Sequence, residues 1–301
     1  MENNKYNMVC FGEILWDVLP SGAKPGGAPM NVAFHLKKLG QNPATVTRVG
    51  MDDRGAALKE LLARQKIATD FVQEDALYAT GVVNATPDEK GNMTYEIIRP
   101  VAWDFIELEE KHEALMRKAD YFIFGSLAAR SPTSHDTLFS LIEMANRKVV
   151  DINLRAPHFG KKIVSDLFAK ADILKLNGDE LDLVTGWFSK YTELNDRINQ
   201  LQDYFKVPTL IVTLGADGAI LRKDGKTYRH PGYKVQVADT VGSGDSFLAA
   251  FLSKTVEGLA PSEALAFASA VGATVASRKG AWASYALEDI KALIDTNVPH
   301  S

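Results

Sequence analysis

Short apolar runs, rich in branched and aromatic residues, alternate along the chain with longer segments in which apolar residues recur every three or four positions. The short runs are typical of strands buried on both faces, and the longer segments of helices that bury one face. The predicted strands are residues 8–12, 45–49, 121–124, 149–152, 173–175 and 210–214. The predicted helices are residues 29–39, 54–65, 132–145, 193–205, 243–257 and 261–277. This alternation predicts an α/β fold of three layers, with helices on both faces of a mainly parallel central sheet.

One interval, between about residues 78 and 99, breaks the alternation. Residues 80–85 and 93–98 carry strand-like patterns, and a turn-forming sequence at 87–92 separates them. This order predicts a β-hairpin that projects from the parallel domain. Such an edge sheet can cover a substrate or pair with its copy in a dimer, and a solvated surface hairpin is the alternative.

The composition favours an ordinary soluble protein. The chain has 301 residues, of which 46% are hydrophobic and 24% charged, and its formal net charge is −4. It contains no long basic run, which argues against a nucleic-acid-binding surface. No apolar run approaches the ~18 residues of a membrane helix, and the first residues lack the pattern of a secretory signal. We therefore expect a cytoplasmic protein with no nucleic-acid partner and no membrane partner.

The most informative motif is the loop Asp-Thr-Val-Gly-Ser-Gly-Asp at residues 239–245, which runs directly into a predicted helix. Its two glycines let the backbone approach a ligand, and the N–H groups of the first helical turn form an anion-binding site. Asp245 would repel a phosphate if binding were the only task of this loop. The presence of Asp245 therefore predicts that it acts as a general base for a hydroxyl, while the amides of residues 243–245 stabilise a phosphoryl group in transfer. A plain turn before a helix is the alternative.

A second group of motifs follows the first predicted strand. Asp17 lies shortly beyond the carboxyl end of this strand, where open α/β sheets bind ligands. Gly26 and Gly27 precede a helix that begins at Pro29 and contains Asn31. A carboxylate, bare backbone and an amide suit a polyol, because each sugar hydroxyl both donates and accepts hydrogen bonds. Taken singly, each of these features is also common in structural turns.

Two further strand ends carry polar residues. Asn177 follows the strand that ends at residue 175, and Glu180 comes three residues later. This spacing is that of a helix capping box, but the same two side chains could organise a hydrated Mg²⁺ beside nucleotide phosphates. Residues 213–218 close the next strand and open a hairpin.

Several common catalytic motifs are missing from the sequence. It has no Walker A loop and no dinucleotide-binding glycine fingerprint after its first strand. Its six histidines show no metal-binding spacing, and Ser243 lies in Gly-Ser-Gly rather than in a hydrolase elbow. Zinc catalysis and serine hydrolysis are therefore not indicated.

In their order along the chain, Gly26-Gly27 with Asn31, Asn177-x-x-Glu180 and the loop at 239–245 closely resemble the motifs of the ribokinase-like (PfkB) sugar kinase family. The resemblance covers nearly the whole chain. Within the family the chain looks most like bacterial fructokinases, on the evidence of segments 12–17, 99–104, 125–130 and 151–155. The chain departs from the family at Val-Gly-Ser, where Thr-Gly-Ala is commoner, but both glycines of the loop are kept. The resemblance implies one ribokinase-like domain over residues 1–301, with a small β lid from about 13–25 and 78–102.

The resemblance also implies a role for each matched position. Asp245 matches the family's catalytic base. The family's anion hole corresponds to Gly242, Ser243 and Gly244. The implied sugar-binding residues are Asp17, Gly26, Gly27, Asn31, Trp103, Asn153 and Arg155. The implied nucleotide-site residues are Asn177, Glu180, Thr213, Gly215, Gly218, Ala270 and Thr274. Glu180 is implied to hold Mg²⁺ through water, and the backbone near Asp239, Val241 and Gly280 to hold a monovalent cation such as potassium.

These observations together predict an ATP-dependent sugar kinase that uses Mg²⁺ and transfers the γ-phosphoryl group to a primary hydroxyl, with fructose as the first choice of substrate. Ribose, 2-keto-3-deoxygluconate and a nucleoside remain open as substrates. A protein that senses sugar without turnover is the alternative from another class. Potassium dependence and a homodimer formed through the β lid also remain open.

Overall fold

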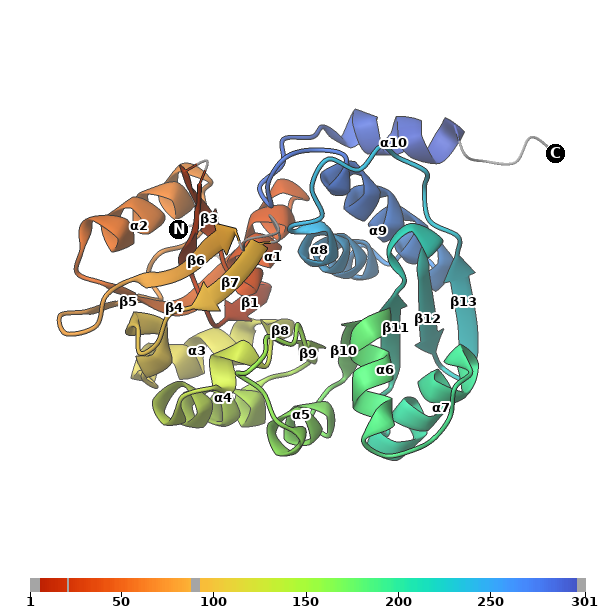
Figure 1. Ribbon diagram of the computed structural model, residues 1–301, viewed down its shortest axis with the longest axis horizontal. Helices are drawn as coiled ribbons and strands as arrows, with labels where there is room; N and C mark the ends of the chain where they lie inside the picture. Colours follow the sequence, from red (N-terminus) through yellow and green to blue (C-terminus); the bar gives the residue numbers. More distant parts are fainter. Residues whose placement is uncertain (1–5, 21, 88–92, 297–301) are drawn as a thin grey trace. The chain divides into compact units, whose positions relative to one another are not determined.

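The computed structural model describes residues 6–20, 22–87 and 93–296 (Figure 1). Contacts within the chain define two compact units. Unit 1 comprises residues 1–37 and 41–146, and unit 2 comprises residues 38–40 and 147–301. The assignment of residues 1–301 to a single domain stays a prediction.

Unit 1 contains a section of parallel sheet with the strand order β8-β1-β4-β5. Its strands are β1 (Met8–Phe11), β4 (Pro43–Gly50), β5 (Val72–Asp75) and β8 (Tyr121–Phe124). Its helices are α1 (Ala28–Lys38), α2 (Asp53–Arg64), α3 (Glu110–Lys118) and α4 (Pro132–Met144), with short 3₁₀ helices η1 (Ala102–Phe105) and η2 (Leu127–Ala129). Every residue of β1 and β8 is buried, which explains why both strands form unbroken apolar runs in the sequence.

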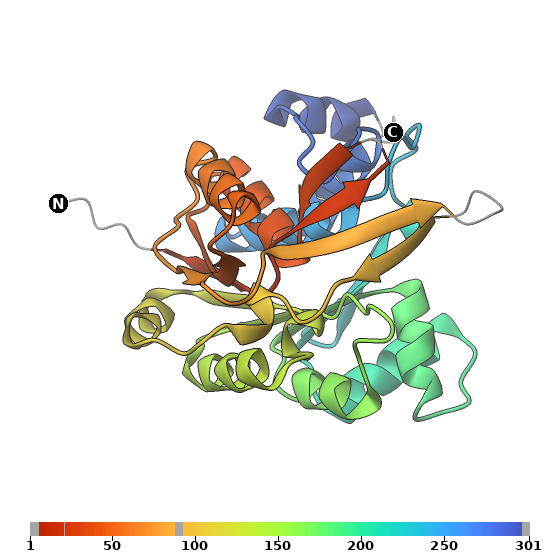
Figure 2. The ribbon, with the colours of Figure 1, turned by 60° about the vertical axis from the view of Figure 1, so that its left-hand side comes forward.

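Unit 1 also holds a separate four-stranded sheet with the order β3-β2-β6-β7 (Figure 2). Its strands are β2 (Leu15–Leu19), β3 (Gly22–Gly26), β6 (Gly81–Pro87) and β7 (Met93–Ile97). The β6–β7 pair is antiparallel, with Val83 opposite Ile97, so the predicted hairpin is confirmed. The predicted turn at 87–92 lies almost entirely outside the described residues. In the sheet, β2 pairs with β3 antiparallel and with β6 parallel, which joins the two segments predicted to form the small β sheet.

Unit 2 contains a sheet section with the order β13-β12-β11-β10-β9. Its strands are β9 (Lys148–Asp151), β10 (Ile173–Asn177), β11 (Thr209–Thr213), β12 (Ala219–Lys223) and β13 (Lys226–His230). The first three are parallel, and the last two add an antiparallel hairpin at the edge. The sequence predicted the hairpin that begins after β11, but it did not predict the last strand.

The helices of unit 2 lie on both sides of this section, with α6 and α7 on one side and α8 and α9 on the other (Figures 1 and 2). The helices are α5 (Lys161–Phe168), α6 (Gly178–Gly186), α7 (Leu194–Phe205), α8 (Ser243–Val256), α9 (Pro261–Ala276) and α10 (Leu287–Thr296), with a 3₁₀ turn η3 (Gly215–Asp217). Helices α8 and α9 pack against each other, and α9 contacts β12 and β13. In α8 every residue from Ser246 to Ser253 is buried, so this helix forms part of the core of the unit.

Candidate active site

The glycine-rich loop of unit 2 ends in the first turn of α8. Gly242 is the N-cap of this helix and has φ of +78°, in the left-handed region that favours glycine. A Cβ at this position would lie 2.6 Å from the Cα of Ala281, so any larger residue would displace the neighbouring loop. The amide of Ser243 donates to the carbonyl oxygen of Thr240 at 3.2 Å, and the amides of the next two residues follow in the same turn.

Asp245 lies where α8 emerges from the core. It is half-buried, whereas the eight residues that follow are fully within the core. The hydroxyl of Ser243 donates to the carbonyl oxygen of Gly272 at 3.1 Å, which fixes the start of α8 to α9. The predicted base and the predicted anion hole therefore form one turn of helix on a rigid support. Helix amides at such a terminus favour negative charge.

Asp239 connects the glycine-rich loop to a second loop of the same unit. One of its carboxylate oxygens accepts from the amide of Val241 at 3.0 Å, and the other accepts from the amide of Gly280 at 2.9 Å. The three residues predicted to surround a monovalent cation are thus brought together. The two bonds explain Asp239 as a clamp between the two loops, and the monovalent-cation site stays a prediction.

The predicted capping box at the start of α6 is confirmed. Asn177 Oδ1 accepts from the amide of Glu180 at 2.8 Å, and Glu180 Oε2 accepts from the amide of Asn177 at 2.9 Å. The other carboxylate oxygen of Glu180 accepts from the amide of Leu154 at 2.8 Å. Burial raises the pKa of the Glu180 carboxyl, although the bond from the Asn177 amide opposes this shift.

These contacts decide how Mg²⁺ could be held at Glu180. Both carboxylate oxygens already accept backbone hydrogen bonds. Within the described ranges, no group of three or more His, Cys, Asp or Glu side chains is arranged to hold a metal ion. The residues therefore fit a hydrated Mg²⁺ that is held through water and phosphate oxygens, and they do not fit a dehydrated ion enclosed by side chains.

The same carboxylate positions two predicted sugar-binding residues. Leu154, whose amide binds Glu180, lies between Asn153 and Arg155. Asn153 has φ of +42°, and the Arg155 guanidinium donates to the Leu154 carbonyl oxygen at 3.0 Å. The capping box of α6 thus also fixes the loop after β9, a connection between distant segments that the sequence did not indicate.

For some of the predicted nucleotide-site residues, packing within unit 2 is enough to explain the residue type, and for others it is not. A Cβ at Gly218 would overlap the carbonyl oxygen of His230, so hairpin closure requires this glycine. Gly215, with φ of +59°, faces open space. Ala270 is fully buried and Thr274 nearly so, and both lie in α9, so packing in the interior of unit 2 explains them.

Four of the predicted sugar-binding residues of unit 1 lie on β2, at the end of β3 and at the start of α1. The carboxylate of Asp17 lies against Gly26, where a Cβ would overlap one of its oxygens. Gly27 has φ of +107°, and a Cβ there would overlap the carbonyl oxygen of Glu13. Asn31 is buried in the first turn of α1, and its backbone amide donates to the Gly27 carbonyl oxygen at 2.9 Å. The structure brings Asp17 and the two glycines together.

Glu13 is a residue of this region that sequence analysis did not select. Its side chain is buried, and its Oε1 accepts from the amide of Ala28 at 3.2 Å, at the start of α1. The distance of fifteen positions along the chain hides this cap from a local reading of the sequence, because capping residues normally lie within three residues of the amide they bind.

Trp103 is well explained by packing. Its ring is only 1% exposed, and the guanidinium of Arg130 lies 3.8 Å from the ring centre. A Cβ at Gly81 would lie 2.5 Å from the indole Nε1, so the ring is also packed against the backbone of β6. Its assignment to sugar binding stays a prediction.

Sequence analysis also missed a buried ion pair beneath the glycine-rich loop. Lys175 of β10 lies directly opposite Asp151 of β9, and its Nζ is 2.9 and 2.7 Å from the two carboxylate oxygens. Both side chains are almost fully buried. The lysine also lies close to Gly244, since a Cβ there would be 3.2 Å from Nζ.

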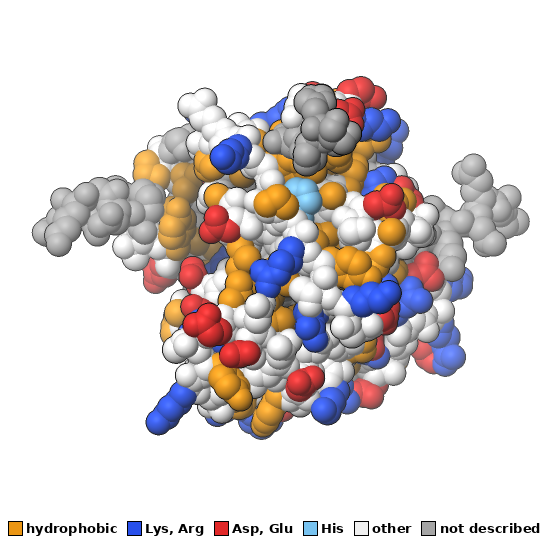
Figure 3. Space-filling model, turned by 90° about the vertical axis from the view of Figure 1, so that its right-hand side faces the viewer, with side chains coloured by type: hydrophobic (Ala, Val, Ile, Leu, Met, Phe, Trp, Pro, Cys, Tyr) orange, Lys and Arg blue, Asp and Glu red, His pale blue; other side chains and the backbone are white. Residues whose placement is uncertain are grey.

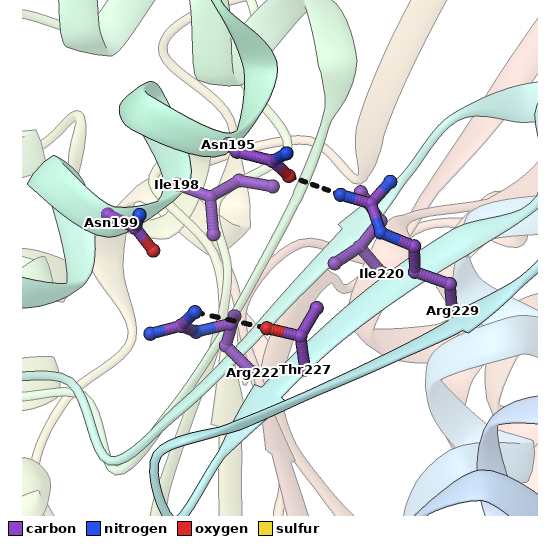
Figure 4. A pocket seen from close by; sticks show the side chains of 7 residues that line it. All are labelled: Asn195, Ile198, Asn199, Ile220, Arg222, Thr227 and Arg229. Atoms are coloured by element: carbon purple, nitrogen blue, oxygen red, sulfur yellow. Dashed lines mark hydrogen bonds between the residues drawn. The ribbon is translucent and has the colours of Figure 1, made fainter.

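A pocket of about 330 Å³ lies elsewhere in unit 2, between α7 and the β12–β13 hairpin (Figure 4). Its lining residues are Asn195, Ile198, Asn199, Ile220, Arg222, Thr227 and Arg229. None of them is among the predicted site residues. Arg222 donates to Thr227 at 3.0 Å and Arg229 donates to Asn195, so their hydrogen bonds across the pocket go to neutral partners.

The face drawn in Figure 3 carries lysine and arginine side chains interspersed with acidic ones, without a continuous basic patch. In the part of the chain that the structure describes, every helix is too short or too polar to cross a membrane.

Comparison with known proteins gives a consistent result. The sequence model of the "pfkB family carbohydrate kinase" matches residues 21–287. A probable fructokinase-5 of Arabidopsis thaliana is 31% identical over 304 residues, covering 91% of this chain and 92% of the relative. A fructokinase of Klebsiella pneumoniae is 28% identical over 302 residues, covering 93% of this chain and 96% of the relative.

Among solved structures, a fructokinase from Xylella fastidiosa with bound ATP superposes with a TM-score of 0.85 at 25% identity, covering 97% of this chain and 99% of that one. The predicted fold class is thereby confirmed as ribokinase-like, with a large, mainly parallel sheet, flanking helices and a small four-stranded sheet. The chain belongs to the pfkB family of carbohydrate kinases and is a phosphotransferase.

Proposed function

We propose that this kinase transfers the γ-phosphoryl group of ATP to a primary hydroxyl of fructose. The observation that carries the proposal is the placement of a half-buried carboxylate, Asp245, in the first turn of a helix whose N-cap is a left-handed glycine. Fructose is the first choice because the relatives at 28–31% identity are named as fructokinases. At this identity a few pocket side chains can change the substrate, so ribose, 2-keto-3-deoxygluconate and nucleosides remain to be tested.

In the proposed mechanism Asp245 accepts the proton of the sugar hydroxyl as that oxygen attacks the phosphoryl group. Amides of the first turn of α8 donate to the phosphoryl oxygens, and they need no rearrangement because the turn is held by α9. Asp17, Gly27 and Asn31 would hold the sugar hydroxyls, together with Asn153 and Arg155. Asn177 and Glu180 would hold a hydrated Mg²⁺, which when bound neutralises charge on the nucleotide phosphates.

The test is an assay of ADP release over fructose, ribose, 2-keto-3-deoxygluconate, adenosine and sugar phosphates, with the Asp245→Asn variant measured in parallel. We expect saturable ADP release with fructose in the wild-type protein and loss of most of it in the variant. Binding of sugar with no ADP release from any compound would contradict the proposal and support the sugar-sensing alternative.

We further propose that potassium stabilises the loops joined by Asp239. The carboxylate of Asp239 holds the backbone of Val241 beside that of Gly280, and a cation bound to backbone oxygens there would keep the anion hole in place. Turnover should rise when K⁺ is added to buffer that contains neither sodium nor potassium. Equal rates with and without each ion would contradict this.

We also propose that the sheet β3-β2-β6-β7 is a lid that excludes water from the sugar, and that it can carry a homodimer contact. Replacing residues 82–97 with a short glycine linker should raise the KM for sugar and permit ATP hydrolysis in its absence. A folded deletion variant with ordinary kinetics would contradict the lid, and an unchanged molecular mass in solution would contradict the dimer contact.

A further inference from the structure

A buried charge lies beneath the glycine-rich loop where the strand pattern calls for an apolar residue. Lys175 follows Ile173 and Leu174 in β10, and all three are buried. Its partner Asp151 is the last residue of β9 and lies opposite it in the register. Taking such a pair out of water is costly, and apolar residues of similar volume are often as stable or more stable. Stability alone therefore gives a poor explanation for this pair.

The position of the ammonium group supplies another explanation. A Cβ built on Gly244 would lie 3.2 Å from Nζ and 3.9 Å from Cε of Lys175, so the end of the lysine is packed against the backbone of the first turn of α8. Glycine at 244 leaves the room that the ammonium occupies. The lysine is held on its other side by both oxygens of Asp151, at 2.9 and 2.7 Å.

Two carboxylates besides that of Asp151 also act on the Lys175 ammonium. Burial acts to lower the pKa of the lysine, but the Asp151 carboxylate and, more weakly, those of Glu180 and Asp245 raise it overall. The ammonium therefore stays protonated. It acts as the shared counter-charge of three carboxylates, two of which belong to the proposed phosphoryl-transfer site.

We propose that Lys175 is a positioning residue for phosphoryl transfer: anchored by Asp151, its ammonium supports the Gly244 backbone and fixes the anion-hole turn and Asp245. This inference rests on the proposed kinase function. It assigns no contact between Lys175 and the substrate. The expected result is a lower kcat with little change in the KM for sugar or the KM for ATP, because the groups that bind sugar and nucleotide remain in place.

The test compares three variants with the wild-type protein in the ADP-release assay. Lys175→Met removes the charge and keeps an unbranched side chain, but it leaves Asp151 buried without its partner. The double variant Asp151→Asn/Lys175→Met removes both charges. It leaves no unpaired buried charge, so a loss of activity in it can be separated from a folding defect. Lys148→Met is the matched control, because Lys148 of β9 also pairs with an aspartate, Asp172, at 3.0 Å in the same sheet section.

We expect the double variant to remain folded and to lose about 10²-fold in kcat, the order of effect of a small misplacement of catalytic groups, with each KM within about threefold. The Lys148→Met control should keep the wild-type kcat. A folded double variant with kcat within about threefold of wild type would overturn the proposal, since the pair would then be only structural. A parallel rise in both KM values with unchanged kcat would overturn it as well.

These outcomes separate the inference from the function on which it rests. An active wild-type enzyme with an unaffected double variant contradicts only the role of Lys175. A wild-type protein that releases no ADP with any sugar contradicts the proposed function, and the positioning role falls with it.

Discussion

Each of the two compact units contains a buried pair of a basic and an acidic side chain, and the two pairs differ in their surroundings. In unit 1, Arg130 donates from Nε to Asp104 Oδ1 at 2.6 Å and from Nη2 to Oδ2 at 2.8 Å. Nη2 also donates to the Ile98 carbonyl oxygen, and Asp104 accepts from the Val101 amide. The charges are neutralised within this pair, and its hydrogen bonds join the segment 98–104 to Arg130, which follows η2.

The pair in unit 2 is arranged differently. Lys175 and Asp151 also form two close contacts, but the lysine additionally faces the Gly244 backbone and the charges of Glu180 and Asp245. The Arg130 guanidinium bonds Asp104 and the Ile98 carbonyl oxygen and lies over the Trp103 ring, which is an arrangement that holds the fold. In our proposal, the pair whose cation is shared with further carboxylates also positions the groups of phosphoryl transfer.

The largest expected effect tests whether the carboxylates near Lys175 are functional. Asp245→Asn removes the proposed base while keeping the size of the side chain. We expect kcat to fall by ~10²- to 10⁴-fold with modest changes in KM, the usual contribution of a general base. Steady-state ADP release at saturating fructose measures this. A kcat close to that of wild type would remove Asp245 from the chemistry and erase the distinction between the two pairs.

The next effect tests the pair in unit 1. Arg130→Met leaves Asp104 buried and unpaired, so we expect a loss of ~3–5 kcal/mol in the free energy of unfolding. Urea denaturation measures this loss, and the kcat of the folded fraction should be unchanged. Arg64→Met is the control, because Arg64 pairs with Glu60 on the exposed surface of α2 and its loss should cost only about 0.5 kcal/mol. Equal losses in the two variants would show that burial of the Arg130 pair has no special role.

A smaller change tests the contact between Gly244 and Lys175. In Gly244→Ala the new methyl group would lie 3.2 Å from the ammonium, so one of the two must shift by a few tenths of an ångström. We expect kcat to fall about 10-fold, with little change in stability. Gly160→Ala is the control, because its Cβ meets open space.

A double-mutant cycle sharpens this result. If the methyl group acts by displacing the ammonium, Gly244→Ala should cost much less in kcat when Lys175 is already methionine. Strictly additive effects would mean that the two residues act independently.

The sequence predicts well what is encoded locally. The alternation of strands and helices, the hairpin of β6 and β7, and the capping box of Asn177 and Glu180 all depend on residues close together in the chain. The strands β5 and β13 and the helices α3, α5 and α10 were missed, because they are short or lack a strong apolar pattern.

Contacts between distant segments could not be predicted in the same way. The Lys175–Asp151 pair depends on the register of β9 against β10, and the Glu13 cap on the turn that brings Ala28 back to it. The predicted strand at 173–175 even ended at Lys175, because a charged residue usually marks the end of a buried run, whereas β10 continues to Asn177. A single sequence carries no signal for either contact.

The smallest expected effect concerns a half-buried carboxylate, Asp52, which is bound by neutral donors and not by a cation. Asp52 of unit 1 caps α2 by accepting from the amide of Gly55 at 2.8 Å, and it accepts from the amide and hydroxyl of Thr80 at 2.8 and 2.7 Å. Burial pushes the pKa of Asp52 upward, but these hydrogen bonds outweigh it and lower the pKa below its usual value.

A carboxyl whose pKa is lower in the folded protein stabilises it at neutral pH. This stabilisation is complete above the unfolded pKa of about 3.9 and is lost as the pH falls through the lower folded value. Asp52→Asn should therefore cost ~1 kcal/mol at pH 7, because its amide nitrogen cannot accept from the Thr80 amide, and the cost should shrink toward zero in acid. Urea denaturation of both proteins from pH 7 to pH 3 measures this, with Asp53→Asn, an exposed position in the first turn of the same helix, as the control. If the difference in the free energy of unfolding between wild type and Asp52→Asn stayed constant with pH, the charge of Asp52 would not contribute. Its neutral donors would then differ in effect from the cations that pair with Asp104 and Asp151.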